Sequence, residues 1–379
     1  DVDGATPEAI ADAVVAWLAR ARGVRVDVGT GRPYPIVIRG GLVDHLGEHV
    51  AALGWGGRIA IVTEPNAAAL AERARRSLDR AGAPVAVVRA PSGEAAKTVR
   101  AVSALWGALA DAGVGRDGGV IAVGGGALGD AAGFAAATYL RGMPVVQVPT
   151  TLLAMVDASI GGKTAIDIAA GKNLVGAFHQ PQAVLIDTDA LATLPRRQRS
   201  SGLAEVVKTA FLVDRASVGH VERAIPGILA GDAGVALTAV TLAAEVKASV
   251  VTADPDERGL RALLNFGHTM GHAYEAASGY RVTHGEAVAV GLVYACALAE
   301  VLELAPAAIR SDVERLLLKA GLRIRAQIPR AAWALLARDK KVRAGKVRWI
   351  LPRRIGRFSE VTDVGERALR AAARVVEAV

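Results

Sequence analysis

Short apolar runs rich in β-branched residues recur along the first half of the chain. They lie at Val24–Val28, Ile36–Arg39, Arg58–Val62, Pro84–Arg89, Gly119–Val123, Val145–Val148 and Ala183–Ile186. Alanine-rich stretches with helical periodicity separate several of these runs. Strands that alternate with helices at this spacing predict a parallel sheet covered by helices on both faces. We therefore expect an α/β, Rossmann-like N-terminal domain over residues 26–190.

The pattern changes after residue 191, where helical periodicity replaces the strand signal. The predicted helices are Glu205–Val213, Leu237–Val251, Thr269–Ala277, Glu286–Leu304, Arg310–Ala320 and Glu366–Val379, with one short strand at Val347–Leu351. These elements predict a mainly α-helical C-terminal domain over residues 191–379. Residues 1–25 are expected to form a separate leading helix, because Thr6-Pro7-Glu8 is a good helix start.

The composition adds limits on compartment and partners. The chain has 379 residues, which is long enough for two domains. We find no uncharged apolar stretch of about 18 residues, so no membrane span is predicted, and the apolar run Ala287–Ala299 is expected to be a buried helix. The single cysteine, Cys296, rules out a disulfide within the chain and fits a cytoplasmic protein.

The basic excess of the chain is uneven. Residues 310–357 contain fifteen Lys and Arg against three acids, within a net charge of +8. Such a region favours either a nucleic-acid surface or a site for an anionic small molecule. Aromatic residues make up only 4% of the chain and none is interleaved with the basic residues as a stacking platform, so we favour the small molecule and expect no nucleic-acid partner.

A glycine-rich loop follows one of the predicted strands. Val120–Val123 leads into Gly124-Gly-Gly-Ala-Leu-Gly-Asp130, and the helical stretch Ala131–Thr138 comes next. This order brings backbone N–H groups and a helix N-terminus to a phosphate. The match to G-x-G-x-x-G is weak, because several strands precede it and no acid lies about 20 residues later. A tight turn with a purely structural role is therefore the alternative.

Three of the seven histidines, His268, His272 and His284, fall within 17 positions. His268 and His272 are four residues apart, so they share one face of a helix. A catalytic zinc needs about three protein ligands. Glu205 lies in an apolar segment three residues before Lys208 and could supply one of them, although a buried ion pair would explain the same two residues. Spacing alone leaves open which two histidines bind metal.

A set of polar residues lies among small and apolar neighbours. These are Asp157, Lys163, Lys172, Asn173, Lys208, Lys247, Arg261 and Asn265. Lys163 and Lys172 are preceded by glycine, which is typical of loops that approach an anion closely. A surface lysine is the simpler interpretation of each one separately. Together with the glycine loop and the metal cluster, the set favours an anionic substrate, hydride chemistry and a Lewis acid.

The motifs that carry these residues resemble those of the 3-dehydroquinate synthases. They are Gly124–Asp130, Pro149–Asp157, Gly161–Lys163, Gly171–Asn173, Gly202–Lys208, Leu264–His272, His284–Val288 and Asp339–Lys341, in that order along residues 34–357. The resemblance implies a metal- and NAD-dependent lyase of the shikimate pathway. Its implied reaction converts 3-deoxy-arabino-heptulosonate 7-phosphate to 3-dehydroquinate and phosphate.

The resemblance also implies a role for each site residue. The zinc ligands would be Glu205, His268 and His284, with cobalt as an alternative ion. The catalytic residues would be His272, Lys208, Asp157, Asn265 and Arg261. The substrate would be bound by Lys163, Asn173, Lys247 and one of Lys340 and Lys341, with Arg141 reaching a neighbouring subunit's site in a homodimer. The NAD site would be lined by Glu64, Asn66, Glu94, Lys97, Gly125, Gly126, Asp130, Thr150, Thr151, Lys172 and Thr193.

Three positions depart from the family's pattern near the cofactor. Glu64 stands where an Asp usually holds the adenosine ribose, Ala190 replaces an aromatic residue and Gln198 replaces a Glu. Two other activities would share the metal and NAD sites: a cyclase acting on sedoheptulose 7-phosphate, and a metal-dependent polyol dehydrogenase. Lys247, Arg261 and Asn265 favour the 3-dehydroquinate synthase reaction over both, because the carboxylate of its substrate needs polar and cationic partners. Residues 1–25 faintly resemble the last helix of a shikimate kinase, which would make them the tail of a fused domain.

Overall fold

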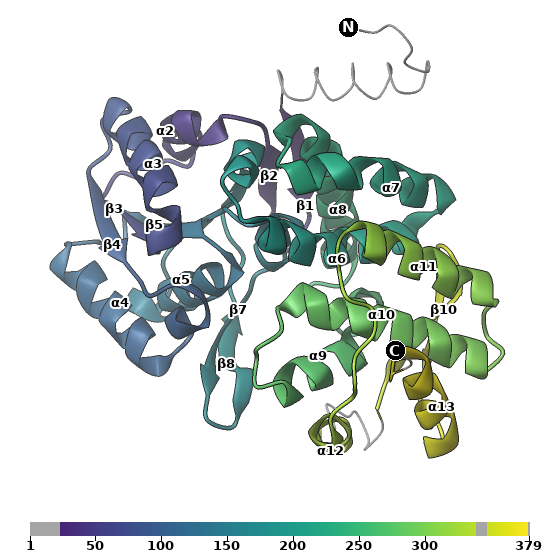
Figure 1. Ribbon diagram of the computed structural model, residues 1–379. Helices are drawn as coiled ribbons and strands as arrows, with labels where there is room; N and C mark the ends of the chain where they lie inside the picture. The colour runs from purple at the N-terminus through teal and green to yellow at the C-terminus, as the bar shows by residue number, and fades with distance from the viewer. Residues whose placement is uncertain (1–22, 339–346, 378–379) are drawn as a thin grey trace, which may run out of the picture. The chain divides into compact units, whose positions relative to one another are not determined.

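The computed structural model describes residues 23–338 and 347–377, and its contacts divide the chain into two compact units (Figure 1). Of the described residues, the first unit comprises 23–194 and 231–253, and the second comprises 195–230, 254–338 and 347–377. Residues 1–22 of the predicted leading helix lie outside the described residues, as do Lys340 and Lys341. Val24 and Arg25, the last two residues of that predicted segment, belong instead to strand β1 (Val24–Val28).

A seven-stranded sheet with the order β1-β2-β9-β6-β5-β3-β4 forms the centre of the first unit. The strands after β1 are β2 (Tyr34–Ile38), β3 (Ile59–Thr63), β4 (Val85–Arg89), β5 (Gly119–Gly124), β6 (Val145–Pro149) and β9 (Ala183–Ile186). β1 pairs antiparallel with β2, and the remaining pairs are parallel, as predicted. The edge pair differs because the short connection between β1 and β2 permits only a hairpin.

Helices cover both faces of this sheet, which confirms the predicted α/β class. β5 shows the reason: Val120 and Ala122 enter one apolar cluster, whereas Ile121 and Val123 enter another. The first cluster includes residues of α4 (Val99–Asp111) and α5 (Gly126–Thr138), and the second includes residues of α2 (Leu46–Ala51) and α3 (Ala68–Arg80). A strand buried on both sides reads as a continuous apolar run, which is the pattern seen in the sequence.

Residues 163–178 form a second, antiparallel hairpin in the first unit, which the sequence pattern did not predict. It consists of β7 (Lys163–Ile168) and β8 (Gly171–Phe178). Lys163 and Lys172 therefore lie on strands, not in the loops expected from their glycine neighbours. The segment before the hairpin contains one turn of π-helix, η5 (Ala154–Ala158), a rare local structure that occurs frequently at functional sites.

The second unit is mainly helical, as predicted. Its elements are α6 (Arg196–Val213), α7 (Arg215–Ala230), η7 (Leu260–Asn265), α9 (His268–Ala277), α10 (His284–Val301), α11 (Ala307–Lys319), α12 (Arg330–Arg338), the hairpin β10 (Trp349–Arg354) and β11 (Arg357–Val361), and α13 (Glu366–Glu377). α10 is its central helix, because it packs against α6, α9, α11 and α13. The run Ala287–Ala299 within α10 is entirely buried, which confirms the predicted core helix.

Helix α8 (Ala233–Ala253) requires a change in the predicted division of the chain. The sequence pattern placed it in the helical domain of residues 191–379, yet it groups with the first unit. It packs on β1, on η5 and on the 3-10 turn η6 (Thr188–Ala192). Helical periodicity reports which face of a helix is apolar but not which partner covers that face, so the pattern could not assign α8.

Among the described residues, two helices, α8 and α10, are long and apolar enough to cross a membrane by length and composition. Half of the most apolar window of α8 and 78% of that of α10 are buried inside the chain. Core helices meet the same criteria, and both helices have protein partners within their own units. Length and composition alone are therefore weak grounds for assigning either helix to a membrane.

Candidate functional site

Three helices of the second unit bring together the residues predicted to bind a metal. Glu205 lies on α6, His268 opens α9 and His284 opens α10. Oε1 of Glu205 lies 3.3 Å from Nε2 of His268 and 3.4 Å from Nε2 of His284. One ring nitrogen from each of His268, His272 and His284 lies within 4.8 Å of the other two. The cluster is thus formed by segments about 80 residues apart in the chain.

The outer nitrogens of two imidazoles are held by partners that orient the rings. Nδ1 of His268 lies 3.1 Å from the carbonyl oxygen of Phe266, and Nδ1 of His284 lies 3.1 Å from Oε2 of Glu275. Both contacts leave Nε2 directed at Glu205. This is the usual arrangement around protein-bound zinc, in which a carbonyl or carboxylate holds the far side of each histidine. Sequence analysis did not identify Glu275, although its position one helical turn after His272 was a usable signal.

Glycines allow the helices of this cluster to approach closely. A Cβ added at Gly291 of α10 would lie 1.9 Å from the carbonyl oxygen of Gly267, which directly precedes α9. A Cβ at Gly285 would lie 1.9 Å from the carbonyl oxygen of Ser201 on α6. Backbone therefore contacts backbone at both crossings. The start of α10 is set by a capping box at Thr283, which places His284 at the first helical position.

The electrostatics of the cluster favour a cation. Burial favours the neutral form of Glu205, but Lys208 and the two imidazoles outweigh it and hold the pKa of the carboxyl well below its ordinary value. Burial and Lys208 lower the pKa of His268. Burial opposes a proton on His284, yet the nearby carboxylates of Glu205 and Glu275 prevail and raise its pKa to about 10. Without metal, a proton on His284 thus offsets part of the carboxylate charge, and a divalent ion would displace it.

The donor set fits a divalent metal. Glu205 is only 2% exposed, and among the described residues neither of its oxygens accepts a well-directed hydrogen bond, although Nζ of Lys208 lies 2.5 Å from Oε2. A buried carboxylate facing two imidazoles through such long contacts is typical of a site that coordinates an ion. The geometry allows His272 as a third imidazole ligand, but His272 is exposed whereas Glu205 is buried.

Other predicted residues of the second unit surround the loop before α9. Nζ of Lys208 donates to the carbonyl oxygen of Leu264, next to Asn265 at the end of η7. Arg261 is 2% exposed and donates to the carbonyl oxygen of Pro255. The carboxylate of Asp254 accepts from the backbone N–H groups of residues 258, 259 and 261 and so fixes the turn that carries Arg261. Asp254 was not among the predicted residues.

In the first unit, the glycine loop connects β5 to α5 as predicted. Gly125 is the N-cap of α5 and Gly126 its first residue. The backbone N–H of Thr150 donates to the carbonyl oxygen of Gly124, which holds the end of β6 beside the loop, and Thr151 caps the turn that follows. The carboxylate of Glu64 accepts from the N–H of Gly125 at 2.8 Å. The loop, Thr150, Thr151 and Glu64 therefore lie together.

A buried lysine connects predicted cofactor and substrate residues. Lys97 is 4% exposed, and its Nζ donates to Oδ2 of Asp130 at 2.5 Å and to Oδ1 of Asn173. Burial raises the pKa of Asp130 to about 6, although the Lys97 ammonium opposes that shift. Asn173 has φ of +56°, a conformation that non-glycine residues adopt rarely. Nearby, Lys172 pairs with Glu94 at 2.8 Å.

Helix α8 supplies a second buried lysine to the first unit. Nζ of Lys247 lies 2.5 Å from both the carbonyl oxygen and Oδ1 of Asp157, on the π-helical turn η5. Lys247 is 8% exposed, so this contact is largely removed from solvent. Lys163, at the start of β7, is by contrast exposed.

The three remaining predicted residues, Arg141, Asn66 and Thr193, lie in turns of the first unit. Arg141 is exposed on the turn after α5, where Leu140 and Arg141 have φ of +50° and +67°, a strained pair of conformations. Asn66 is exposed in the turn η2 (Pro65–Ala67). Thr193 donates to the carbonyl oxygen of Ala190 at the end of η6.

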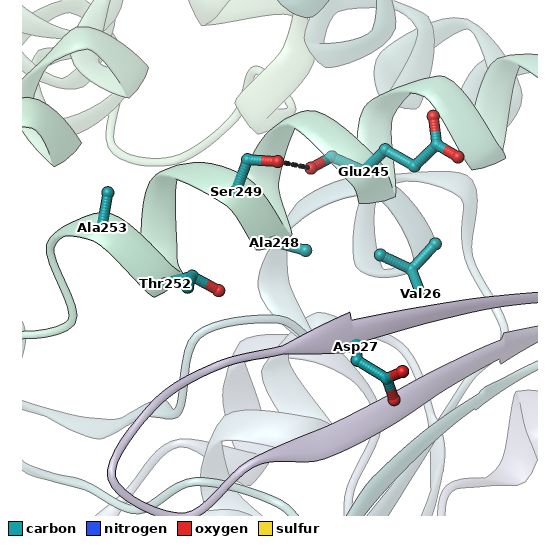
Figure 2. Close-up of a pocket in the computed structure, with 7 residues that line it drawn as sticks. All are labelled: Val26, Asp27, Glu245, Ala248, Ser249, Thr252 and Ala253. Atoms are coloured by element: carbon teal, nitrogen blue, oxygen red, sulfur yellow. Dashed lines mark hydrogen bonds between the residues drawn. The ribbon is translucent and has the colours of Figure 1, made fainter.

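One pocket in the described chain is lined by no residue of the metal cluster or of the glycine loop. It has a volume of about 600 Å³ and lies between β1 and α8 (Figure 2). Its lining residues are Val26, Asp27, Glu245, Ala248, Ser249, Thr252 and Ala253. None of these was predicted to take part in chemistry, and the hydrogen bond drawn there joins Ser249 to the backbone of Glu245 within one helix. The residues predicted to bind metal, substrate and cofactor do not line this pocket.

Comparison with protein families gives two adjoining matches. Residues 87–201 match the family model described as 3-dehydroquinate synthase N-terminal, and residues 202–342 match the one described as 3-dehydroquinate synthase C-terminal. The 3-dehydroquinate synthase of Symbiobacterium thermophilum is 46% identical over 343 residues, which cover 89% of this chain and 96% of that protein. The enzyme of the same name from Pelotomaculum thermopropionicum is 43% identical over 339 residues, covering 88% of this chain and 91% of that protein.

Two solved structures share the fold. A 2-deoxy-scyllo-inosose synthase, complexed with carbaglucose-6-phosphate, NAD+ and Co²⁺, has a TM-score of 0.84 and 26% identity, covering 93% of this chain and all of that one. The 2-epi-5-epi-valiolone synthase of Streptomyces hygroscopicus subsp. jinggangensis 5008, with NAD+ and Zn²⁺ bound, has a TM-score of 0.83 and 31% identity, covering 90% of this chain and 96% of that one. Both neighbours bind NAD+ and a divalent metal.

Proposed function

This chain belongs to the 3-dehydroquinate synthase family, and from that premise we propose that it converts 3-deoxy-arabino-heptulosonate 7-phosphate to 3-dehydroquinate and phosphate. The reaction would combine transient oxidation by NAD, elimination of phosphate, return of the hydride and an intramolecular aldol closure. NAD is regenerated in this sequence. The observation that carries the proposal is the convergence of Glu205, His268 and His284 from three helices on one point.

We assign the metal to Glu205, His268 and His284, with zinc preferred and cobalt as the alternative. A bound ion would act as a Lewis acid, lowering the pKa of a substrate hydroxyl that it coordinates. The exposed His272, one turn along α9 from His268, would transfer a proton to or from the substrate. Lys208, held against Glu205 and the carbonyl oxygen of Leu264, would donate to a substrate hydroxyl.

Cationic and amide side chains would bind the two anionic groups of the substrate. Arg261, in the turn fixed by Asp254, and Asn265, at the end of η7, supply donors in the second unit. Lys163, Asn173 and Lys247 supply donors in the first. Donors already held in place cost little reorganisation when a charge develops, as it does on a departing phosphate. We include Lys340, Lys341 and the homodimer role of Arg141 in the same proposal.

The dinucleotide would be bound by the first unit. Backbone N–H groups at the start of α5 suit its pyrophosphate. Thr150, Thr151 and Glu64 lie at the loop, and Asp130, which pairs with Lys97, lies one helical turn further along α5. Asn66, Glu94, Lys172 and Thr193 complete the proposed set. We include a cytoplasmic location in the proposal, which the single cysteine of the chain fits.

The test is a balanced product assay. Purified protein with 3-deoxy-arabino-heptulosonate 7-phosphate, catalytic NAD and zinc should release phosphate and 3-dehydroquinate in equal amounts, and a chelator should abolish both. Glu205→Gln should lose the activity, whereas Glu245→Gln, a change at an exposed carboxylate of α8, should keep it. Metal-loaded wild-type protein that forms neither product would refute the assignment.

The same assay separates the alternatives. A cyclase of the sedoheptulose 7-phosphate type would release phosphate from that sugar and ignore the substrate that carries a carboxylate. A polyol dehydrogenase, given a polyol and excess NAD in a parallel reaction, would form one NADH for each substrate molecule oxidised. The two solved neighbours described above are a 2-deoxy-scyllo-inosose synthase and a 2-epi-5-epi-valiolone synthase, so the assay should also include sedoheptulose 7-phosphate as a competing substrate.

A further inference from the structure

Glu64 lies at the end of β3, where the family resemblance leads us to expect a shorter Asp in contact with the adenosine ribose. Its carboxylate instead bridges two loops of the first unit. Oε1 accepts from the N–H of Gly125 at 2.8 Å, and Oε2 accepts from the N–H of Gly93 at 3.0 Å. Glu64 is 7% exposed, so the charge is mostly withdrawn from water.

The glycine loop is fitted closely around this carboxylate. Cβ atoms added at Gly124 and Gly125 would lie 3.1 and 3.3 Å from Oε1 of Glu64. Gly125 is the N-cap of α5, a helix of 13 residues, and no side chain of the first turn caps that end. Glu64 is thus the anion that the chain itself places against the helix terminus where a dinucleotide phosphate would bind.

We propose that Glu64 sets the affinity of the dinucleotide site by acting as an internal anion, and that it weakens the binding of NAD by opposing the pyrophosphate. The proposal rests on the assignment of NAD to this loop. A second negative charge near an occupied helix N-terminus is repelled, and a phosphate that takes the N–H of Gly125 must first displace Glu64. The extra methylene of Glu makes the contact, since an Asp carboxylate would end about 1.5 Å short of the same position.

Two substitutions separate the effect of the Glu64 charge from the effect of its side-chain length. Glu64→Gln keeps the length but removes the charge, and Glu64→Asp keeps the charge but withdraws it. We expect both variants to bind NAD about three- to tenfold more tightly than wild type, measured by isothermal titration calorimetry on the full chain. Circular dichroism melting checks that each variant is folded, and either one suffices for the test if the other fails to fold.

Inorganic pyrophosphate, measured as a competitor of NAD, is the decisive probe because it has no ribose. Both variants should bind it more tightly than wild type by a similar factor. If only NAD binding improves, and only in Glu64→Asp, then Glu64 acts through the ribose and the proposal is wrong. Equal affinities of all three proteins for NAD would also overturn it and leave the proposed function intact. If no protein binds NAD at millimolar concentration, the cofactor assignment falls and the proposal falls with it.

Discussion

The close crossing of α10 over the start of α9 provides a sharp test of how the fold builds the metal centre. Gly291→Ala would place a Cβ 1.9 Å from the carbonyl oxygen of Gly267 and 2.8 Å from the N–H nitrogen of Gly271. Cβ atoms essentially never approach other atoms within 3.0 Å, so the two helices would have to separate by roughly 1 Å. Both obstructing atoms belong to the backbone, so no side-chain rotation can relieve the contact.

The cost can be estimated from known core substitutions. Overpacking a core by one methyl group typically costs 1 to 3 kcal/mol, and the backbone contact argues for the upper end, about 3 kcal/mol. For a unit of this size that corresponds to a melting temperature lower by roughly 6 to 12 °C. Metal ligands tolerate displacements of only about 0.2 Å, so zinc affinity should fall as well, because His268 and His284 lie on the two separated helices.

The assay pairs thermal melting with zinc competition against a chromophoric chelator. The matched control is Gly107→Ala in α4, where an added Cβ meets nothing within 4 Å. That change should stabilise the chain by roughly 0.5 to 1 kcal/mol, since Gly is unfavourable within an exposed helix. If Gly291→Ala melts within 2 °C of wild type and binds zinc equally well, the account of the crossing is refuted.

Three further outcomes are expected. Glu275→Gln should weaken zinc binding by roughly 10- to 100-fold through loss of the charged partner of His284, and unchanged affinity in the same chelator competition would contradict that role. Asp254→Asn should raise KM for the substrate by roughly tenfold with little change in NAD affinity, because its carboxylate orders the turn that carries Arg261; equal KM values would count against it. The N–H donors of residues 261 and 258 lower the pKa of Asp254 in the folded chain. The stability that this carboxylate contributes is therefore complete above the ordinary pKa of 3.8 and is lost as the pH falls through the lower folded pKa. Melting temperatures of wild type and Asp254→Asn, measured across acid pH, should converge below the folded pKa.

Much of the fold could be predicted from the sequence, because continuous apolar runs and helical periodicity reflect burial within one segment. The strands of the parallel sheet and the buried helix α10 follow from such patterns. The three histidines His268, His272 and His284, within 17 positions, likewise favoured a metal centre, although spacing alone left open which two of them bind the ion. Glu205 stood out because a charged residue in an apolar segment is costly unless it has a partner.

Tertiary structure decided what no single segment contains. The apolar residues of α8 do not specify which element covers them, and only its contacts with β1 and η5 place Lys247 beside Asp157. Glu275 and Asp254 act through partners that depend on how a chain turn or a second helix returns to them. The direction of the Glu64 carboxylate depends on two loops that meet only in the folded chain. Sequence determined the elements and the donor types, whereas packing of distant segments determined which donors share a point in space.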